Sequence, residues 1–210
     1  MNDSSHEKYS RQILFAPIGE EGQRLLLASS AVIVGCGAIG AAAANLLTRS
    51  GVGKLRIIDR DFVEPSNLQR QTLFDEADAL AALPKAIAAE RKLRSINSSV
   101  SVEGIVADLS SPNAEDLLAR FDLIIDGTDN FETRFLINDF AVQNAKPWIY
   151  AAAVASYGLT MTIRPGATPC LACLMDTQQQ GLEETCDTIG VLGPIVNLIA
   201  SLEEIGRAHV

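Results

Sequence analysis

The chain has 210 residues with a net charge of −9 at neutral pH, and 48% of its residues are hydrophobic. This length suits one domain with a sizeable core, while the acidic balance excludes a broad surface that tracks nucleic-acid phosphates. No segment is apolar for long enough to span a bilayer and residues 1–10 carry no apolar signal core, so we expect a cytoplasmic protein without a nucleic-acid or membrane partner.

Apolar strand patterns and amphipathic helix patterns alternate along most of the chain, which is typical of a sheet covered by helices on both faces. The first part of the expected order is a strand at 31–35, a helix at 38–50, a strand at 54–59, a helix at 84–97 and a strand at 100–106. The second part is a helix at 113–120, a strand at 122–126, a helix at 131–145, a strand at 148–153 and an antiparallel hairpin partner at 157–164. A loop at 165–187 and an apolar helix at 189–205, broken near Pro194, complete this α/β pattern.

A glycine-rich loop, Gly-Cys-Gly-Ala-Ile-Gly at residues 35–40, connects the first strand to the first helix. Gly35 permits a tight turn, Gly37 lets the backbone approach a phosphate, and Gly40 allows the helix to pack close to the strand. Asp59 follows about twenty residues later, where such a unit carries its ribose-binding carboxylate. A plain packing turn, and an Asp59 that only caps a turn, are the simpler alternatives.

Amide and guanidinium donors follow Asp59 in the run Ser66-Asn67-Leu68-Gln69-Arg70-Gln71. Their position just past the acid indicates a site that grips a triphosphate. Lys85 lies in the first turn of a helix, where a cation opposes the helix dipole unless an anion is nearby. A bound phosphate would remove that conflict, although a solvated lysine is the simpler explanation.

The segment Asp126-Gly127-Thr128-Asp129-Asn130 follows a strand, at the edge where open α/β sheets bind their ligands. Asp129 is suited to hold Mg²⁺ through one carboxylate while phosphate oxygens and waters fill the remaining positions. The spacing of Asp129 and Glu132 also fits a helix cap with a reciprocal acid, and the two roles are compatible.

Four cysteines in a chain of this class are better explained as metal ligands, reactive thiols or core residues than as disulfides. Cys170 and Cys173 have the spacing of half a zinc site, but two thiolates do not close a tetrahedral shell. Cys186 is either a nucleophile or a small buried thiol. Cys36, inside the glycine loop, is expected to serve packing.

Taken together, several motifs resemble the MoeB/ThiF/HesA adenylyltransferase family, which is related to ubiquitin-activating enzymes. These motifs are Tyr9-Ser10-Arg11-Gln12-Ile13, the glycine loop, Asp59-Arg60-Asp61, residues 66–71, Pro84-Lys85, Thr128-Asp129-Asn130, residues 169–173 and Thr185-Cys186. Residues 130–135 especially resemble the ThiF-type members that serve thiamine biosynthesis. The resemblance implies an α/β fold with a Rossmann-like, mostly parallel sheet, helices on both faces, and an antiparallel extension that is cut short at the C-terminus.

The resemblance implies that ATP and Mg²⁺ are used to adenylate the C-terminal glycine of a ubiquitin-like sulfur-carrier protein of thiamine or molybdopterin biosynthesis, with release of pyrophosphate. A carboxylate is already ionised at pH 7 and attacks the α-phosphorus without a general base. This fits a sequence with no histidine between residues 7 and 208. Catalysis then consists of positioning and of cancelling negative charge.

By the same resemblance, the residues that contact ATP or its metal are Gly35, Gly37, Ala38, Gly40, Asp59, Asp61, Ser66, Asn67, Arg70, Lys85, Asp129 and Asn130. Arg70 and Lys85 would neutralise phosphate charge, and Asp129 would hold Mg²⁺. Arg11 matches an arginine that reaches into the partner subunit's site, which implies a homodimer. Cys186 matches the position at which some members form a covalent link to the carrier.

The family normally continues past this point with more sheet and a second Cys-x-x-Cys pair. This chain ends in Glu204-Ile205-Gly206-Arg207-Ala208-His209-Val210, which resembles the translation of a sequencing adapter. We therefore expect an adenylyltransferase domain over residues 1–203, incomplete at its C-terminus, and a non-native tail over residues 204–210. Zn²⁺ would have only Cys170 and Cys173 as ligands in this chain.

Two other classes of function compete with this reading. An NAD-dependent oxidoreductase fits the glycine loop and Asp59, but the sequence lacks a core histidine and a Tyr-x-x-x-Lys pair to move a proton. Such an enzyme would also have no need of Arg70, Lys85 and Asp129 around phosphates. A non-catalytic relative that holds nucleotide or carrier without turnover is the second alternative.

Overall fold

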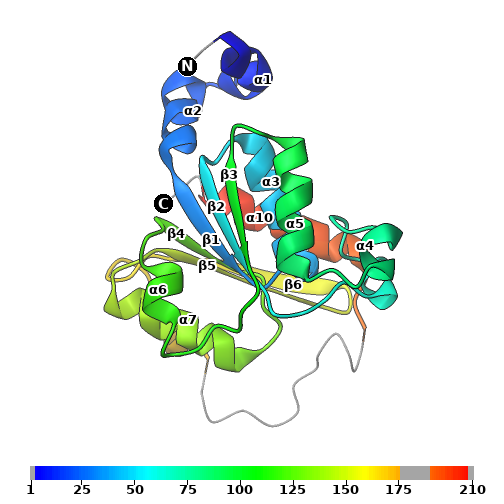
Figure 1. The fold of residues 1–210 in the computed structure, drawn as a ribbon. Coiled ribbons are helices and arrows are strands. Elements are labelled where there is room, and N and C mark those ends of the chain that lie inside the picture. The colour runs from blue at the N-terminus through cyan, green and yellow to red at the C-terminus, as the bar shows by residue number, and fades with distance from the viewer. Residues whose placement is uncertain (1–2, 176–189, 208–210) are drawn as a thin grey trace.

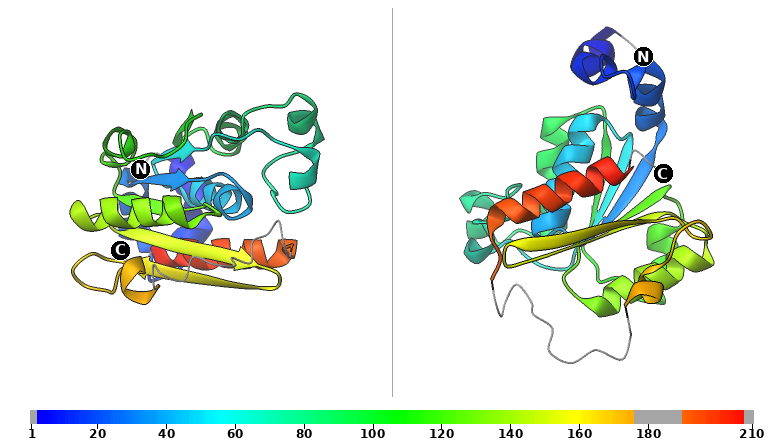
Figure 2. Two further views of the ribbon diagram at one scale, coloured as in Figure 1. Left: turned by 90° about the horizontal axis from the view of Figure 1, so that it is seen from below. Right: turned by 180° about the vertical axis from the view of Figure 1, so that it is seen from behind.

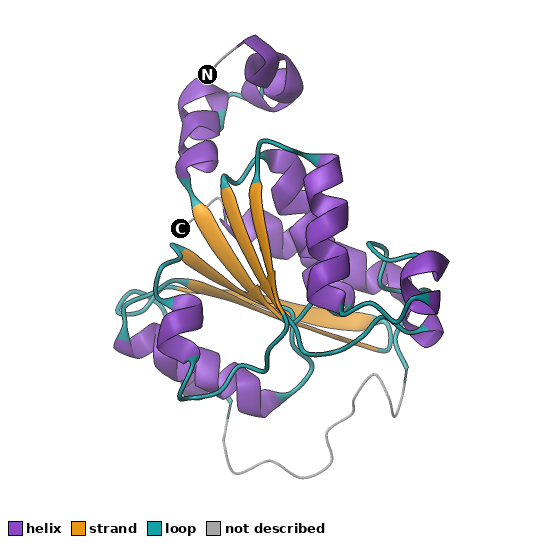
Figure 3. Cartoon of the chain, viewed as in Figure 1, coloured by secondary structure: helices purple, strands orange, loops and turns teal. Residues whose placement is uncertain are grey.

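The computed structural model describes residues 3–175 and 190–207, which form a six-stranded sheet flanked by helices (Figures 1 and 3). The strands are β1 (Ser30–Val34), β2 (Lys54–Ile58), β3 (Ser101–Ile105), β4 (Leu123–Asp126), β5 (Trp148–Val154) and β6 (Tyr157–Ile163). The helices are α1 (Asp3–Ile13), α2 (Gly19–Ala28), α3 (Ala38–Ser50), α4 (Glu76–Leu80), α5 (Lys85–Ile96), α6 (Ala114–Leu118), α7 (Phe131–Gln143), α8 (Leu171–Leu174) and α10 (Gly193–Arg207), with a short 3₁₀ turn, η1 (Pro65–Asn67).

The sheet has the strand order β3-β2-β1-β4-β5-β6, in which the first five strands are parallel and β6 runs antiparallel to β5. This confirms the mostly parallel sheet with an antiparallel extension. The order reverses between β1 and β4, and Val34 at the end of β1 pairs with both Ile58 and Asp126. Three strand ends therefore meet at one point, where open α/β sheets bind ligands.

Helices cover both faces of the sheet (Figures 1 and 2). Alternate residues of β1 point to opposite faces, since Ala31 and Ile33 belong to the core under α3, α5 and α10, whereas Val32 and Val34 belong to the core under α6 and α7. Burial on both faces explains why the parallel strands are continuous apolar runs in the sequence. Among the described helices, none is both long and apolar enough to cross a bilayer.

The expectation of a helix broken near Pro194 is wrong. Helix α10 begins at Gly193 and runs without interruption to Arg207, with Pro194 in its first turn. Proline is tolerated there because the first N–H groups of a helix have no partner inside it. The helix packs on α3, β5 and β6.

Two helices at the N-terminus, α1 and α2, have no counterpart in the sequence-based prediction. They lie beyond the amino ends of the strands (Figure 1). Tyr9 anchors α1, because its ring is buried against Gly51 and its hydroxyl accepts a hydrogen bond of 2.8 Å from the Asn97 amide. Polar contacts of this kind, from Tyr9 to a residue 88 positions later, leave no local pattern in the sequence.

Candidate functional site

A cavity of about 780 Å³ opens at the carboxyl ends of the parallel strands. Its wall is built from the loops that follow β1, β2 and β4, together with residues of η1, β5 and β6. This size lies within the range of pockets that hold a nucleotide-sized ligand. The predicted site residues that line it are Gly35, Gly37, Ala38, Asp59, Asp61, Asn67, Arg70, Lys85, Asp129 and Asn130.

Glycines bring the loops after β1 and β4 into backbone contact. Gly35 has a φ of +87°, and a Cβ there would overlap the carbonyl group of Gly127. A Cβ on Gly40 would overlap the carbonyl oxygen of Gly35, so Gly40 serves close packing and does not line the cavity. Gly37 differs, because a Cβ there would meet only ordinary contact at 3.8 Å while its backbone faces the cavity.

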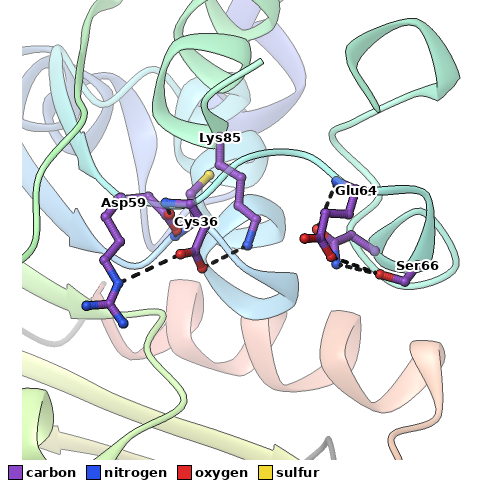
Figure 4. Close-up of polar contacts among 8 residues, drawn as sticks. Cys36, Asp59, Glu64, Ser66 and Lys85 are labelled. Carbon is purple, nitrogen blue, oxygen red and sulfur yellow. Dashed lines mark hydrogen bonds and ion pairs between the residues drawn. The ribbon is translucent and has the colours of Figure 1, made fainter. Parts of the chain in front are cut away.

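Asp59 ties the glycine loop to the end of β2 (Figure 4). Its Oδ2 accepts a hydrogen bond of 2.6 Å from the Cys36 N–H, and its Oδ1 accepts one of 2.7 Å from the Asp61 N–H. Burial raises the pKa of the Asp59 carboxyl, while these N–H groups and the charge of Lys85 oppose that effect. Asp59 does bind turn backbone, as the simpler alternative held, and it also lines the cavity.

Lys85 reaches from the start of α5 toward Asp59 and the glycine loop (Figure 4). The residue is 7% exposed, and its Nζ lies 3.3 Å from Oδ2 of the exposed Asp61. Asp61 is therefore an anion that relieves the conflict between Lys85 and the helix dipole. The ammonium group is held at the cavity wall by this pair.

The polar run after β2 divides between cavity and surface. Asn67 is buried at the end of η1, where its Oδ1 accepts a hydrogen bond of 3.2 Å from the Glu64 N–H. Arg70 donates through Nη1 to the carbonyl oxygen of Ser66 at 2.9 Å. The Ser66 hydroxyl donates to Glu64 instead and does not line the cavity (Figure 4).

Asp129 is exposed at the cavity edge, and its carboxylate has no hydrogen bond or ion pair with any other described residue. The suggestion that Asp129 caps the next helix is wrong, because the N-cap of α7 is Asn130, whose Oδ1 accepts a bond of 2.9 Å from the Thr133 N–H. A single carboxylate fits Mg²⁺ that is shared with phosphate oxygens. Within residues 3–175 and 190–207, no group of three or more His, Cys, Asp or Glu side chains could hold a metal alone.

A buried ion pair beside this loop was not assigned a role from the sequence, and its arginine, Arg134, lines the cavity. Asp126 is fully buried at the end of β4, and its Oδ2 lies 3.1 Å from Nε of Arg134 on α7. Burial raises the pKa of the Asp126 carboxyl, while Arg134 and the two donors of Thr128 oppose that effect. The only local signal was an arginine one turn into a helix, where a cation opposes the dipole.

Arg11 is exposed on α1, beyond the amino ends of the strands, so it lies away from the cavity of its own chain (Figure 1). The structure brings the other basic candidates, Arg70 and Lys85, to the cavity wall. Arg11 is separated from them by the length of the sheet.

The cysteines fall into three environments. Cys36 is fully buried in the core, where burial raises the pKa of its thiol far above the usual range, so its packing role is confirmed. Cys170 and Cys173, at the start of α8, have Sγ atoms 3.4 Å apart and lie outside the cavity. Cys186 lies outside the described residues.

Comparisons with known proteins agree on one family. The sequence profile described as the ThiF family matches residues 9–204. The sulfur carrier protein ThiS adenylyltransferase of Bacillus subtilis (strain 168) is 53% identical over 193 residues, which cover 92% of this chain and 57% of that protein. The protein of the same name from Escherichia coli (strain K12) is 37% identical over 206 residues, covering 98% of this chain and 81% of that protein.

Solved structures show the same fold. E. coli MccB with ATP superposes with a TM-score of 0.81 at 25% identity, covering 99% of this chain and 65% of that chain. The microcin C7 biosynthetic enzyme MccB in complex with N-formylated MccA gives a TM-score of 0.81 at 26% identity, covering 98% and 66%. The chain thus spans a little over half of the B. subtilis relative and about two thirds of these structures.

Proposed function

This chain belongs to the ThiF family, and we propose that it uses ATP and Mg²⁺ to adenylate the C-terminal glycine of a ubiquitin-like sulfur-carrier protein, releasing pyrophosphate. One observation carries the proposal: Lys85, Arg70 and the unpaired carboxylate of Asp129 converge on a single cavity beside a glycine turn. The names of the B. subtilis and E. coli relatives support a sulfur carrier of the ThiS type as the protein substrate. We assign the protein to the cytoplasm, where thiamine or molybdopterin sulfur transfer would use it.

The residues of the cavity match the parts of ATP in turn. The backbone at Gly37 and the N-terminus of α3 favour phosphate. Each Asp59 oxygen accepts one backbone N–H and keeps acceptor capacity for a ribose hydroxyl. Arg70 and Lys85, with Asn67 beside them, supply donors and positive charge along the triphosphate. Bound at Asp129, Mg²⁺ would neutralise phosphate charge.

The proposed reaction requires the protein to position the reactants and to stabilise negative charge. The carrier carboxylate, ionised at neutral pH, forms a bond to the α-phosphorus, while the bond from that phosphorus to the oxygen bridging the β-phosphate breaks. Arg70 and Lys85 stabilise the charge that develops on the phosphate oxygens. No general base is required, and the described cavity wall contains no histidine.

Arg11 is proposed to act in a second copy of the chain, which makes the active form a homodimer. Helix α1, which carries Arg11, is anchored to the rest of the domain, since Gln12 donates a hydrogen bond of 3.0 Å to the Ser50 carbonyl and Tyr9 is anchored as described above. Its distance from its own cavity means that any catalytic contribution must go to a partner's site.

Zinc is proposed as a structural metal with Cys170 and Cys173 as two of its four ligands. Two sulfurs bound to one tetrahedral zinc lie about 3.8 Å apart, given Zn–S bonds of about 2.3 Å. The observed Sγ separation of 3.4 Å supports this pairing. The role of Cys186 as a site of covalent attachment to the carrier also stays a proposal.

The test is exchange of labelled pyrophosphate into ATP in the presence of Mg²⁺ and a ThiS-type carrier. The proposal expects exchange that depends on the carrier and is abolished by Asp129→Ala. Asp139→Ala, on α7 and outside the cavity, is the control. Nucleotide binding without exchange would support the non-catalytic relative instead.

A further inference from the structure

We infer that Arg134 is a positioning residue that clamps the loop after β4 so that the Asp129 carboxylate faces the metal. This inference rests on the proposed function, in which Asp129 holds Mg²⁺. Arg134 also lines the cavity, but its Nε and Nη2 donate to acceptors within the protein, so the role that we infer for it is exerted through the loop of residues 126–130.

The guanidinium group of Arg134 has three acceptors on two segments of the chain, residues 126–128 and β5. Its Nε donates to Oδ2 of Asp126 at 3.1 Å, at the end of β4. Its Nη2 donates to the carbonyl oxygen of Thr128 at 2.7 Å and to that of Ala151, on β5, at 3.3 Å. The residue is only 6% exposed. A buried side chain with three fixed acceptors holds the loop against two strands.

Thr128 is held from both sides. Its N–H and hydroxyl donate to Oδ1 of Asp126 at 2.9 and 2.6 Å, while its carbonyl oxygen accepts from Arg134. On the other side of Asp129, the cap at Asn130 fixes the start of α7. The backbone of Asp129 therefore lies between two fixed residues, and its carboxylate alone is left free for a ligand.

The same loop is packed on the glycine turn. The Gly127 N–H donates to the Val34 carbonyl oxygen at 2.7 Å, and a Cβ on Gly127 would overlap the Gly35 carbonyl oxygen. The clamp thus sets the position of Asp129 relative to the turn that is proposed to hold phosphate. A metal shared between a carboxylate and a phosphate needs that relative position to be fixed.

Lysine cannot replace this arginine. The guanidinium lies 5.2 Å from the ring centre of Phe131 and 5.3 Å from that of Tyr150, contacts that favour a flat cation. An ammonium group is a point charge on a flexible stem and cannot hold three acceptors in one plane. Arg134→Lys keeps the charge beside Asp126 and loses the clamp.

The experiment measures metal and nucleotide binding separately. Mn²⁺ binding is followed by electron paramagnetic resonance with a nonhydrolysable ATP analogue present, and binding of the analogue alone is measured in EDTA. We expect Arg134→Lys to weaken Mn²⁺ binding about tenfold while changing nucleotide binding in EDTA less than twofold. In the same variant, the Mg²⁺ concentration for half-maximal pyrophosphate exchange should rise as Mn²⁺ binding weakens.

Arg56→Lys is the matched control. Arg56 bonds the Glu103 carboxylate and the carbonyl oxygen of Leu117, and it lies 4.8 Å from the ring centre of Phe121, but it lies outside the cavity. The Arg56→Lys variant should bind both Mn²⁺ and the nucleotide analogue within twofold of the wild type. Unchanged Mn²⁺ binding in Arg134→Lys, or equal losses of Mn²⁺ and nucleotide, would overturn the positioning role.

A second variant covers the case in which Arg134→Lys does not fold. Asp126→Asn combined with Arg134→Gln removes both buried charges and leaves amides in their place. The binding constants for Mn²⁺ and for the nucleotide analogue are measured again in this double variant. We expect a selective loss of Mn²⁺ binding, and Mn²⁺ binding equal to that of the wild type would count against the positioning role of Arg134. Wild-type protein that binds the analogue but no Mn²⁺ would instead refute the metal site of the proposed function, and this inference with it.

Discussion

Gly35 and Gly127, 92 residues apart in the chain, face each other with no room for a side chain on either. A Cβ built on Gly35 meets the Gly127 carbonyl, and a Cβ built on Gly127 meets the Gly35 carbonyl oxygen. The loops after β1 and β4 can therefore approach as bare backbone. This contact places the glycine turn and Asp129 on the same cavity.

Replacing Gly127 by alanine should destabilise the fold. The added methyl group overlaps backbone that cannot move without disturbing β1, so we expect the free energy of unfolding in urea to fall by about 2 kcal/mol. Gly22→Ala is the control, because a Cβ in α2 would contact only the Ile18 side chain. If Gly127→Ala were as stable as Gly22→Ala, the close contact between the loops would be disproved.

Replacing Gly37 by alanine should leave the stability of the fold nearly unchanged and weaken the binding of ATP. Its φ is −76° and a Cβ has room against the protein, so stability is expected to stay within about 0.5 kcal/mol of the wild type. The methyl group would occupy space at the cavity wall, and ATP binding measured by calorimetry should weaken about tenfold. Unchanged ATP affinity would mean that phosphate does not approach this turn.

Two lysines on α5 allow a matched comparison of charge at the cavity. Lys85 pairs with one aspartate and Lys92 with two, but only Lys85 lines the cavity. We expect Lys85→Met to slow pyrophosphate exchange at least about a hundredfold because developing phosphate charge loses its partner. Lys92→Met should stay within about threefold of the wild-type rate. Similar losses in both variants would indicate a general effect on α5.

Subunit mixing tests the role of Arg11. Arg11→Ala and Asp129→Ala are each expected to lose exchange activity, since one lacks the donated arginine and the other lacks the metal ligand. When the two proteins are mixed, heterodimers should contain one intact site and recover part of the activity. Absence of recovery, with subunit exchange shown by native mass spectrometry, would rule out action across the interface.

Glu203 on α10 should make stability depend on pH. Its side chain is fully buried, and neither oxygen has a hydrogen-bond partner within the described residues. Burial raises the pKa of this carboxyl well above its usual 4.5, so the folded protein keeps a proton that the unfolded chain releases. The contribution of Glu203 to stability is then fully present below about pH 4.5 and is lost as pH rises, by up to about 1.4 kcal/mol per pH unit.

Glu203→Gln removes this titration, so the free energy of unfolding of the variant, relative to that of the wild type, should be higher at pH 8 than at pH 5. Urea unfolding at the two pH values measures this difference. Glu115→Gln, at an exposed position on α6, is the control and should give the same small difference at each pH. An equal difference for Glu203→Gln at both pH values would show that the carboxyl is not held neutral.

Local patterns in the sequence were sufficient for the order and type of the elements around the sheet. Apolar runs of five residues, helical spacing and the glycine at 51, where φ is +84°, depend on neighbouring residues alone. The same holds for the glycine turn and for the presence of Asp59 and Lys85 at strand and helix ends. Helices α1 and α2 were not predicted, because Tyr9, which anchors α1, contacts residues that are far from it in the sequence.

The sequence by itself determined an α/β chain with a phosphate-type turn and a set of charged residues at the strand ends. Only the tertiary structure decided what each polar residue does at the cavity. Asp129 and Asn130 both line it, but Asn130 caps α7 and leaves the Asp129 carboxylate free. Ser66 turns to Glu64 and leaves Asn67 and Arg70 at the wall. The tertiary structure also paired Asp126 with Arg134 beside the loop. Each of these choices depends on which distant backbone groups need a partner, and that is known only once the strands lie side by side.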